Sequence, residues 1–153
     1  MKTYSPDKLC VYPDKSTLFQ SVARQLVDYA NECVAQRQVF TLALAGGSTP
    51  AGLYQLLTTS PYYDQMPWSQ TYFYFGDERF VPHDHGDSNF AMAKSTLFDH
   101  APVSEKQIYA IPTDCSFAAE CAEHYAQLLD QVPSLDLVLL GMGDDGHTAS
   151  LFP

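Results

Sequence analysis

The sequence has little positive charge. It contains 8 Lys and Arg residues against 18 Asp and Glu residues, which gives a formal net charge of −10. This balance disfavours nucleic acids and anionic membranes as partners. It still allows a small anionic ligand, because backbone N–H groups and one or two cations hold a phosphate whatever the overall charge.

Long apolar runs are also missing. No stretch approaches the length of a bilayer span, and residues 1–11 lack the apolar core of a signal peptide. The chain has no internal repeat and no low-complexity stretch. We therefore expect a cytoplasmic protein that has no membrane partner.

Recognisable cysteine spacings are absent as well. Cys10, Cys33, Cys115 and Cys121 form no CxxC pair and no zinc pattern. We expect four reduced thiols, as in most cytosolic proteins, rather than disulfides. Residues 83–87, HDHGD, have metal-ligand side chains but also read as a short polar turn without a second ligand cluster. Neither a metal nor another cofactor is expected.

What the sequence does contain is the pattern of one α/β domain over residues 1–153. Hydrophobic residues make up 46% of the chain and charged residues 17%, which is typical of a globular protein with one core. Apolar, β-branched and aromatic runs predict strands, and apolar residues at helical spacing predict helices. The expected strands are 9–12, 39–45, 71–75, 107–111 and 135–140; the expected helices are 16–34, 48–57, 88–98 and 117–132. Their alternation predicts a mainly parallel sheet.

Three loops follow the carboxyl ends of predicted strands, and in parallel sheets ligands bind at these ends. In the first, residues 45–50 (AGGSTP), Gly46 and Gly47 let the backbone approach a ligand closely. Ser48 and Thr49 add hydroxyls at a helix start, whose free N–H groups suit a phosphate. The alternative is an ordinary turn capped by Ser or Thr, with proline in the first helical turn.

The second loop, residues 75–82 (FGDERFVP), brings three charged side chains out of a strand together. They are Asp77, Glu78 and Arg79. Arg79 suits pairing with a carboxylate or two-pronged binding of an anionic oxygen. The alternative is a solvated ion pair at the surface.

The third loop, residues 141–153 (GMGDDGHTASLFP), opens with the pattern G-x-G-x-x-G. A dinucleotide site is rejected, because Asp144 and Asp145 would repel a pyrophosphate. His147 beside Asp145 is a candidate general base, since a carboxylate fixes the tautomer and stabilises the imidazolium. Spacing leaves open whether Asp145 reaches His147, and the alternative is a surface histidine without a role.

Together the loops resemble the 6-phosphogluconolactonases, within a wider group that includes the glucosamine-6-phosphate deaminases. The resembling segments are GGSTP at 46–50, GDERFVP at 76–82, SNF at 88–90 and GMGDDGHTASLFP at 141–153. The deaminases read DEY in place of DER and GHIAFNEP in place of GHTASLFP. Arg79, Ser150 and Leu151 therefore favour the lactonase branch.

The resemblance implies a three-layer α/β/α fold with a Rossmann-like sheet. It also implies hydrolysis of 6-phospho-D-glucono-1,5-lactone to 6-phosphogluconate in the oxidative pentose phosphate pathway. His147 would act as the base, with Asp145 beside the lactone and Arg79 on the substrate or an active-site carboxylate. The expected substrate and phosphate contacts are Gly46, Gly47, Ser48, Thr49, Asp77, Glu78, Asn89, Gly143 and Gly146. No G-x-S-x-G motif is present, which favours direct attack by water over an acyl-enzyme.

The departure from the family is length. Its members run considerably further past the last motif, into strands, helices and basic residues that bind the phosphate. We therefore expect a C-terminally truncated domain whose sheet is incomplete and exposes an apolar edge. Two alternatives remain: a deaminase and isomerase of an amino-sugar phosphate, and a sugar-phosphate-binding protein without activity.

Overall fold

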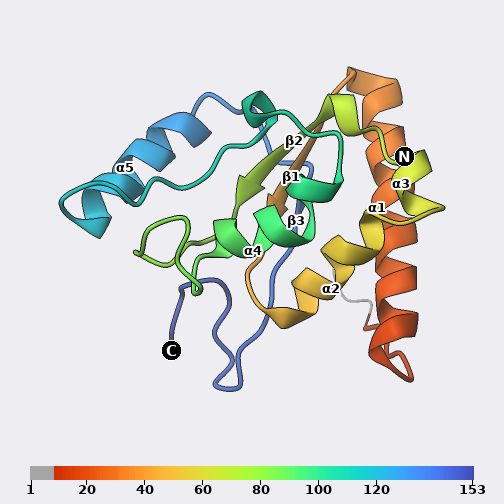
Figure 1. Ribbon diagram of the computed structural model, residues 1–153, viewed down its shortest axis with the longest axis horizontal. Helices are drawn as coiled ribbons and strands as arrows, with labels where there is room; N and C mark the ends of the chain where they lie inside the picture. The colour runs from red at the N-terminus through yellow and green to blue at the C-terminus, as the bar shows by residue number, and fades with distance from the viewer. Residues whose placement is uncertain (1–8) are drawn as a thin grey trace.

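The computed structural model describes residues 9–153, and strands and helices alternate along them as expected (Figure 1). The strands are β1 (Phe40–Leu44), β2 (Thr71–Phe75) and β3 (Leu137–Val138). The α-helices are α1 (Lys15–Arg37), α2 (Ser48–Leu57), α3 (Tyr62–Gln65), α4 (Asn89–Thr96) and α5 (Ala118–Leu129). Short 3-10 turns occupy η1 (Trp68–Gln70), η2 (Phe98–His100) and η3 (Glu105–Gln107). None of the described helices is long and apolar enough to cross a membrane.

The sheet is parallel, with the strand order β2-β1-β3. All five residues of the central strand β1 are buried, as its apolar sequence FTLAL predicts. Leu44 at the end of β1 pairs with Phe75 at the end of β2, so both strands stop at the same level. The loops that follow them therefore leave the sheet side by side.

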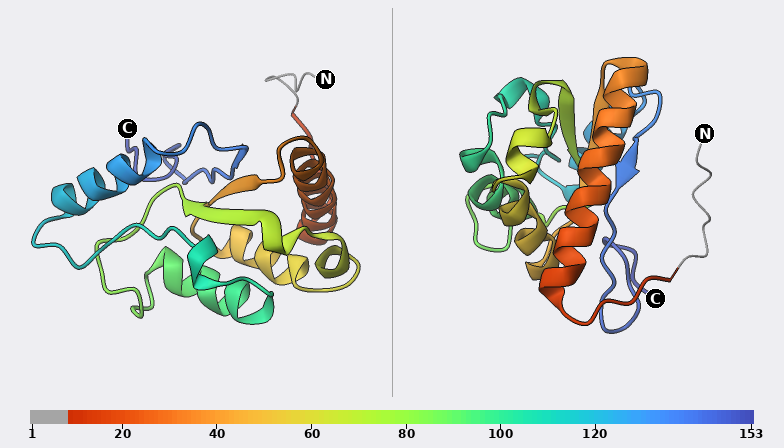
Figure 2. Two further views of the ribbon diagram at one scale, coloured as in Figure 1. Left: turned by 90° about the horizontal axis from the view of Figure 1, so that it is seen from above. Right: turned by 90° about the vertical axis from the view of Figure 1, so that its right-hand side faces the viewer.

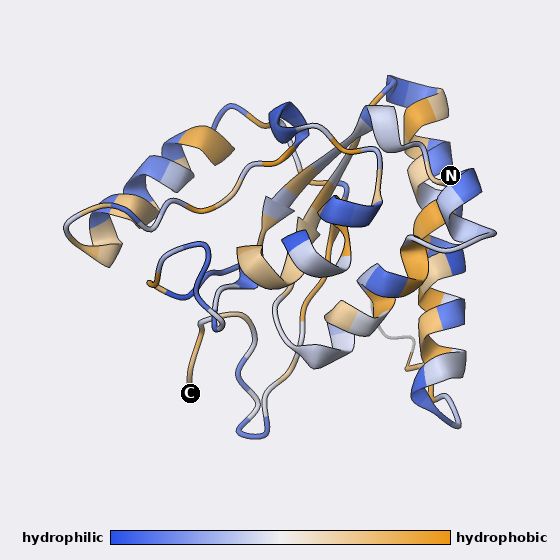
Figure 3. Cartoon of the chain, in the orientation of Figure 1, coloured by the Kyte–Doolittle hydropathy of each residue, from blue (hydrophilic) through white to orange (hydrophobic). Residues whose placement is uncertain are grey.

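Helices cover both faces of the sheet, which confirms the three-layer α/β/α class. In the left view of Figure 2, α2 and α4 lie on one side of β1 and β2, and α5 lies on the other. Hydrophobic and hydrophilic residues alternate along α1 (Figure 3), whose buried residues Leu26, Val27 and Ala30 belong to the common core. Full burial of a large apolar side chain such as Leu26 stabilises the fold by roughly 1.5–3 kcal/mol.

Several predicted boundaries are wrong at the N-terminal end. Residues 9–12 are not a strand. Helix α1 begins at Lys15, one residue before the expected start, and its N-cap is Asp14. The Asp14 carboxylate accepts a hydrogen bond from the Thr17 backbone N–H at 2.7 Å, which satisfies a free donor of the first turn.

The last two predicted strands are much shorter than expected. Within 107–111 only Ile108 forms a bridge, to Phe73, because the capped turn η3 occupies the preceding residues. Within 135–140 only Leu137 and Val138 form a strand, and neither residue is fully buried. The Val138 side chain is 42% exposed and Leu140 is 64% exposed, so an apolar edge is open to solvent, as expected.

The expectation of four reduced thiols is wrong for two of them. Cys115 and Cys121 form a disulfide, whereas Cys10 is free and exposed and Cys33 is free and buried. The turn before α5 brings the two Cα atoms within 5.6 Å, a proximity that a spacing of six residues does not reveal. Within residues 9–153, the three metal-ligand side chains that lie together are these two cysteines and Asp114, and the disulfide occupies both sulfurs.

Candidate active site

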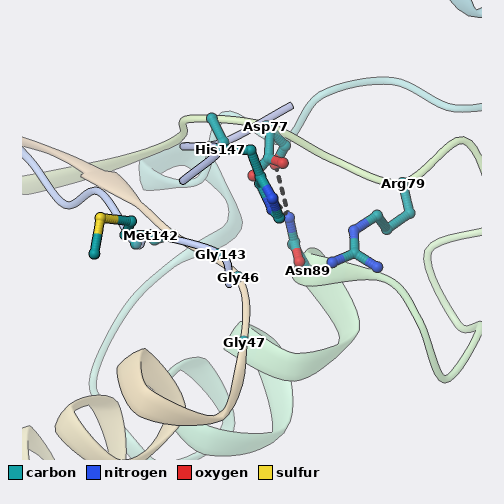
Figure 4. A pocket seen from close by; sticks show the side chains of 11 residues that line it. Gly46, Gly47, Asp77, Arg79, Asn89, Met142, Gly143 and His147 are labelled. Carbon is teal, nitrogen blue, oxygen red and sulfur yellow. Dashed lines mark hydrogen bonds between the residues drawn. The ribbon is translucent and has the colours of Figure 1, made fainter. Parts of the chain in front are cut away.

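The three loops converge at the carboxyl ends of the strands and enclose a pocket of about 200 Å³ (Figure 4). Its lining residues are Ala45, Gly46, Gly47, Asp77, Arg79, Asn89, Gly141, Met142, Gly143, His147 and Ala149. Seven of the residues expected at the site therefore line it. The other five, which are Ser48, Thr49, Glu78, Asp145 and Gly146, lie outside the lining.

The first loop is a glycine turn with a free helix start. Gly47, at φ +99°, is the N-cap of α2 and supplies no side-chain cap, so the reading of Ser48 as the cap is wrong. Ser48 and Thr49 are exposed and belong to the first turn of α2. The N–H groups of this turn therefore keep their capacity to bind an anion beside the pocket.

Gly46 is a glycine because Asn89 packs directly against it. A Cβ atom at Gly46 would lie 2.0 Å from Asn89 Oδ1, much closer than any real contact. Beneath this turn, the hydroxyl of Tyr54 bonds both the N–H and the carbonyl of Ala45, each at 2.9 Å. Burial raises the pKa of Tyr54 well above its usual range, so the hydroxyl stays protonated and donates. The end of β1 is thereby fixed where the loop begins.

In the second loop, Glu78 caps helix α4. Its carboxylate accepts the backbone N–H groups of Asn89 at 2.7 Å and Phe90 at 2.8 Å, and the Ser88 hydroxyl at 3.1 Å. It also accepts the backbone N–H of Arg79 at 2.7 Å. The carboxylate is therefore engaged with the protein, and this geometry does not support the expected contact between Glu78 and the substrate.

Arg79 is exposed and lines the pocket near Asn89 (Figure 4). Within residues 9–153 no carboxylate lies within ion-pair distance of its guanidinium. The alternative of a surface ion pair is therefore not what the structure shows. A guanidinium that faces a pocket without a partner suits an anionic oxygen of a ligand.

In the third loop, Asp145 does reach His147. Asp145 Oδ1 lies 2.5 Å from His147 Nδ1 and 3.2 Å from the His147 backbone nitrogen. Hydrogen bonds from the imidazole and then from the backbone N–H hold the pKa of the Asp145 carboxyl below its ordinary value. With Nδ1–H donated to the carboxylate, His147 Nε2 carries the lone pair that can accept a proton.

The imidazole of His147 is held between a glycine and an aromatic ring. A Cβ atom at Gly143 would lie 2.1 Å from His147 Cε1, and the Phe152 ring centroid is 4.8 Å from that of His147. Gly143 N–H also bonds the His147 carbonyl at 2.8 Å. Gly146, at φ +87°, shapes the turn between them.

Two buried tyrosines, Tyr54 and Tyr125, hold the strand ends beneath the site, and sequence patterns did not point to either of them. Tyr125 bonds the N–H of Phe75 at 2.9 Å and its carbonyl at 3.3 Å, and so fixes the end of β2 as Tyr54 fixes that of β1. Burial raises the pKa of Tyr125 to about 12. A tyrosine on the apolar face of a helix is predicted to be a core residue. No pattern in the sequence indicates that its hydroxyl bonds the backbone at the end of a strand.

The polar loop at 83–87 has no ligand cluster in the described part of the chain. His83 Nε2 lies 2.8 Å from the Ile111 carbonyl oxygen, and its ring packs against Phe90 with centroids 4.6 Å apart. These contacts give His83 a packing role.

Comparison with known proteins identifies the family of this chain. A family model described as glucosamine-6-phosphate isomerases/6-phosphogluconolactonase matches residues 13–153. A rice protein (Oryza sativa subsp. indica) named probable 6-phosphogluconolactonase 3, chloroplastic, is 41% identical, over 95% of this chain and 48% of its own length. A 6-phosphogluconolactonase from a Nostoc species is 38% identical, over 94% of this chain and 61% of its own.

The solved structures lead to the same family. The 6-phosphogluconolactonase of Trypanosoma brucei superposes with a TM-score of 0.82 at 30% identity, over 94% of this chain and 62% of that one. The chain thus spans about half to three fifths of the length of the relatives it matches. With the family model matched along almost the whole sequence, the chain belongs to the glucosamine-6-phosphate isomerase/6-phosphogluconolactonase family.

Proposed function

We propose that this protein hydrolyses 6-phospho-D-glucono-1,5-lactone to 6-phosphogluconate, the lactonase step of the oxidative pentose phosphate pathway. One observation carries the proposal. His147, which is bonded through Nδ1 to Asp145, lines a pocket together with Arg79, whose guanidinium has no carboxylate within ion-pair distance among residues 9–153. The names of the rice and Nostoc relatives support the same reaction.

The pair formed by Asp145 and His147 suits activation of water. His147 Nε2 takes a proton from a water molecule as the water oxygen attacks the lactone carbonyl carbon. Asp145 stabilises the imidazolium that forms, because its carboxylate already accepts the Nδ1 proton. The tetrahedral intermediate then releases the ring oxygen, which takes the proton back from His147 and becomes the hydroxyl of the sugar acid.

Two features at the pocket and beside it are complementary to the phosphate end of the substrate. The first turn of α2 offers free N–H groups behind Gly47, where nothing lies within 4 Å of an added Cβ. Arg79 offers a cation without a carboxylate partner in the described part of the chain. Anions bind favourably at helix starts and to guanidinium groups, so the phosphate is expected between them.

The deaminase and isomerase alternative receives no specific support from the site. That reaction needs an acid and a base acting at carbon. Arg79, Ser150 and Leu151 stand where the deaminases read differently, and these three residues favour the lactonase branch. A binding protein without activity is separated from a lactonase by the assay below.

The test is lactone hydrolysis by the protein, with the spontaneous rate subtracted. We predict that His147→Ala lowers kcat by roughly 10²–10⁴-fold with little change in KM, because the base acts in the transition state. The acidic limb of the pH profile should disappear with it. A near-normal kcat in this variant would place the base elsewhere.

The cytoplasmic location expected from the sequence stays a prediction, since the rice relative is named chloroplastic. Fractionation of cells that express the tagged protein checks it.

A further inference from the structure

The third loop, which carries His147, is bound mainly to itself. Gly146 N–H bonds the Gly143 carbonyl at 2.9 Å, and the Thr148 hydroxyl bonds the Gly141 carbonyl at 2.8 Å. Within the described residues, one hydrogen bond joins residues 140–153 to the rest of the protein. It runs from the Ser150 hydroxyl to Asp77 Oδ2 at 2.8 Å.

Asp77 is well placed to anchor such a loop, because its other oxygen is already held. Asn89 Nδ2 donates to Asp77 Oδ1 at 3.1 Å and to the Asp77 carbonyl at 3.0 Å (Figure 4). Asn89 itself is buried, and Glu78 accepts its backbone N–H. Asp77 is therefore hydrogen-bonded to Asn89, the first residue of α4, whose backbone Glu78 holds in place.

Charge also argues for an anchoring role. Asp77 lines a pocket that is proposed to bind a phosphorylated lactone, and a carboxylate there repels the phosphate. No described cation forms an ion pair with Asp77. Its two oxygens instead accept one protein donor each, from Asn89 and from Ser150.

We propose that Asp77 and Ser150 form a latch that positions the His147 loop over the pocket. Asp77 is then a positioning residue rather than the substrate contact that its place in the second loop indicates. The catalytic part of this inference rests on the proposed lactonase function. Ser150 lies three residues from His147, so loss of the latch frees the whole segment and displaces the imidazole from the reacting carbon.

Activity provides the first test. Ser150→Ala should lower kcat by about ten- to a hundredfold, since a misplaced catalytic group costs up to that much, with KM changed less than about twofold. Ser150→Thr keeps a hydroxyl and should restore most of the rate. Ser95→Ala is the matched control, because its hydroxyl bonds only the Met92 carbonyl of its own helix, and it should leave kcat unchanged.

A double-mutant cycle then tests the pairing. Asp77→Ala removes both carboxylate oxygens, so it breaks the hydrogen bond from Ser150. In that background Ser150→Ala should have no further effect, since the two changes remove the same bond. Independent, multiplying effects of the two substitutions would overturn the latch.

Hydrogen exchange separates failure of the latch from failure of the proposed function. In Ser150→Ala, the amides of Gly143 and Gly146 should exchange several-fold faster, while those of β1 keep their protection. If the parent protein shows no lactonase activity but this change in exchange occurs, the latch stands and the function falls. If exchange and kcat both stay within twofold of the parent, the latch is wrong.

Discussion

At the scale of single residues, the Asp145 carboxylate links the third loop to pH. Its pKa is lowered in the folded protein, chiefly by the hydrogen bond from the His147 side chain. A group with a lowered pKa stabilises the folded state above its unfolded pKa, and this stabilisation is lost as the pH falls through the folded value. Asp145 thus stabilises the loop at neutral pH and stops doing so in acid.

We therefore predict that the third loop opens below the ordinary Asp pKa of 3.8, before the core unfolds. Exchange of the Gly146 amide should rise there relative to amides of β1. Asp145→Asn should exchange quickly at every pH, because its amide accepts the Nδ1 proton less well than a carboxylate. If the parent and this variant show the same pH dependence, the Asp145 carboxylate does not hold the loop.

Gly143 sets the position of the imidazole by lacking a side chain. A Cβ atom there would lie 2.1 Å from His147 Cε1, so the ring has to move. Gly143→Ala is expected to lower kcat by about ten- to a hundredfold, with little change in melting temperature, because the loop is outside the core. Gly86→Ala is the control, since nothing lies within 4 Å of its added Cβ, and it should behave like the parent.

At the scale of elements, the start of α4 depends on an acidic cap from another loop. Glu78 accepts the Asn89 and Phe90 N–H groups and the Ser88 hydroxyl, and Ser88 in turn accepts the Ala91 N–H at 3.1 Å. The negative charge also faces the positive end of the helix dipole. Helix α4 and the second loop are therefore one unit.

Removal of this cap should reduce stability rather than binding. Glu78→Ala is expected to lower the free energy of unfolding by about 2 kcal/mol, since hydrogen bonds to charged groups contribute about 1.5–3 kcal/mol. Glu78→Gln, which keeps one acceptor, should lose less. Denaturant titration measures both, and Glu123→Ala on the exposed side of α5 serves as the control. If Glu78→Ala leaves the free energy of unfolding unchanged and raises KM, Glu78 contacts the substrate and is not a structural cap.

The sequence predicts those elements that depend on neighbouring residues, and it does not predict contacts between residues that lie far apart along the chain. The strands at 39–45 and 71–75 are confirmed as β1 and β2, since their apolar and aromatic runs act locally. The helix expected at 88–98 is present as α4, with Ser88 as its N-cap. By contrast, Glu78 capping a helix eleven residues away and the disulfide of Cys115 with Cys121 need the tertiary fold. No periodicity encodes them.

The candidate site follows the same division. Because loops after parallel strands meet at one edge, the convergence of the three loops is predictable from the order of strands alone. The role of each side chain is not, since Asp77 and Glu78 are neighbours in the sequence with different partners. One holds the third loop through Ser150 and the other holds α4 through Asn89.

At the scale of the whole molecule, the described sheet ends in an open apolar edge. Next to β3 lies a groove of about 410 Å³, whose apolar lining comes from α1 and from Leu137 and Leu139. Val138 and Leu140 on the same segment are exposed. Uncovered strands with apolar side chains pair readily with other chains.

We predict that the 153-residue chain associates in solution at micromolar concentration. Sedimentation velocity should show species larger than a 17.0 kDa monomer. Val138→Lys together with Leu140→Lys should shift the distribution toward monomer, because charge on an edge strand opposes pairing. Tyr63→Lys, at an exposed residue of α3 rather than of this edge, is the control. A compact monomer of the parent chain would contradict the prediction.

The contact between Gly46 and Asn89 has a consequence for how this site can vary. A side chain at position 46 displaces Asn89. Asn89 donates a hydrogen bond to Asp77, and Asp77 accepts one from Ser150, so the displacement reaches the third loop. In a library of random variants, a change at any of these four positions should be tolerated only with compensating changes at the others. Gly46 and Ser150 should therefore vary together among active variants, although they lie in different loops.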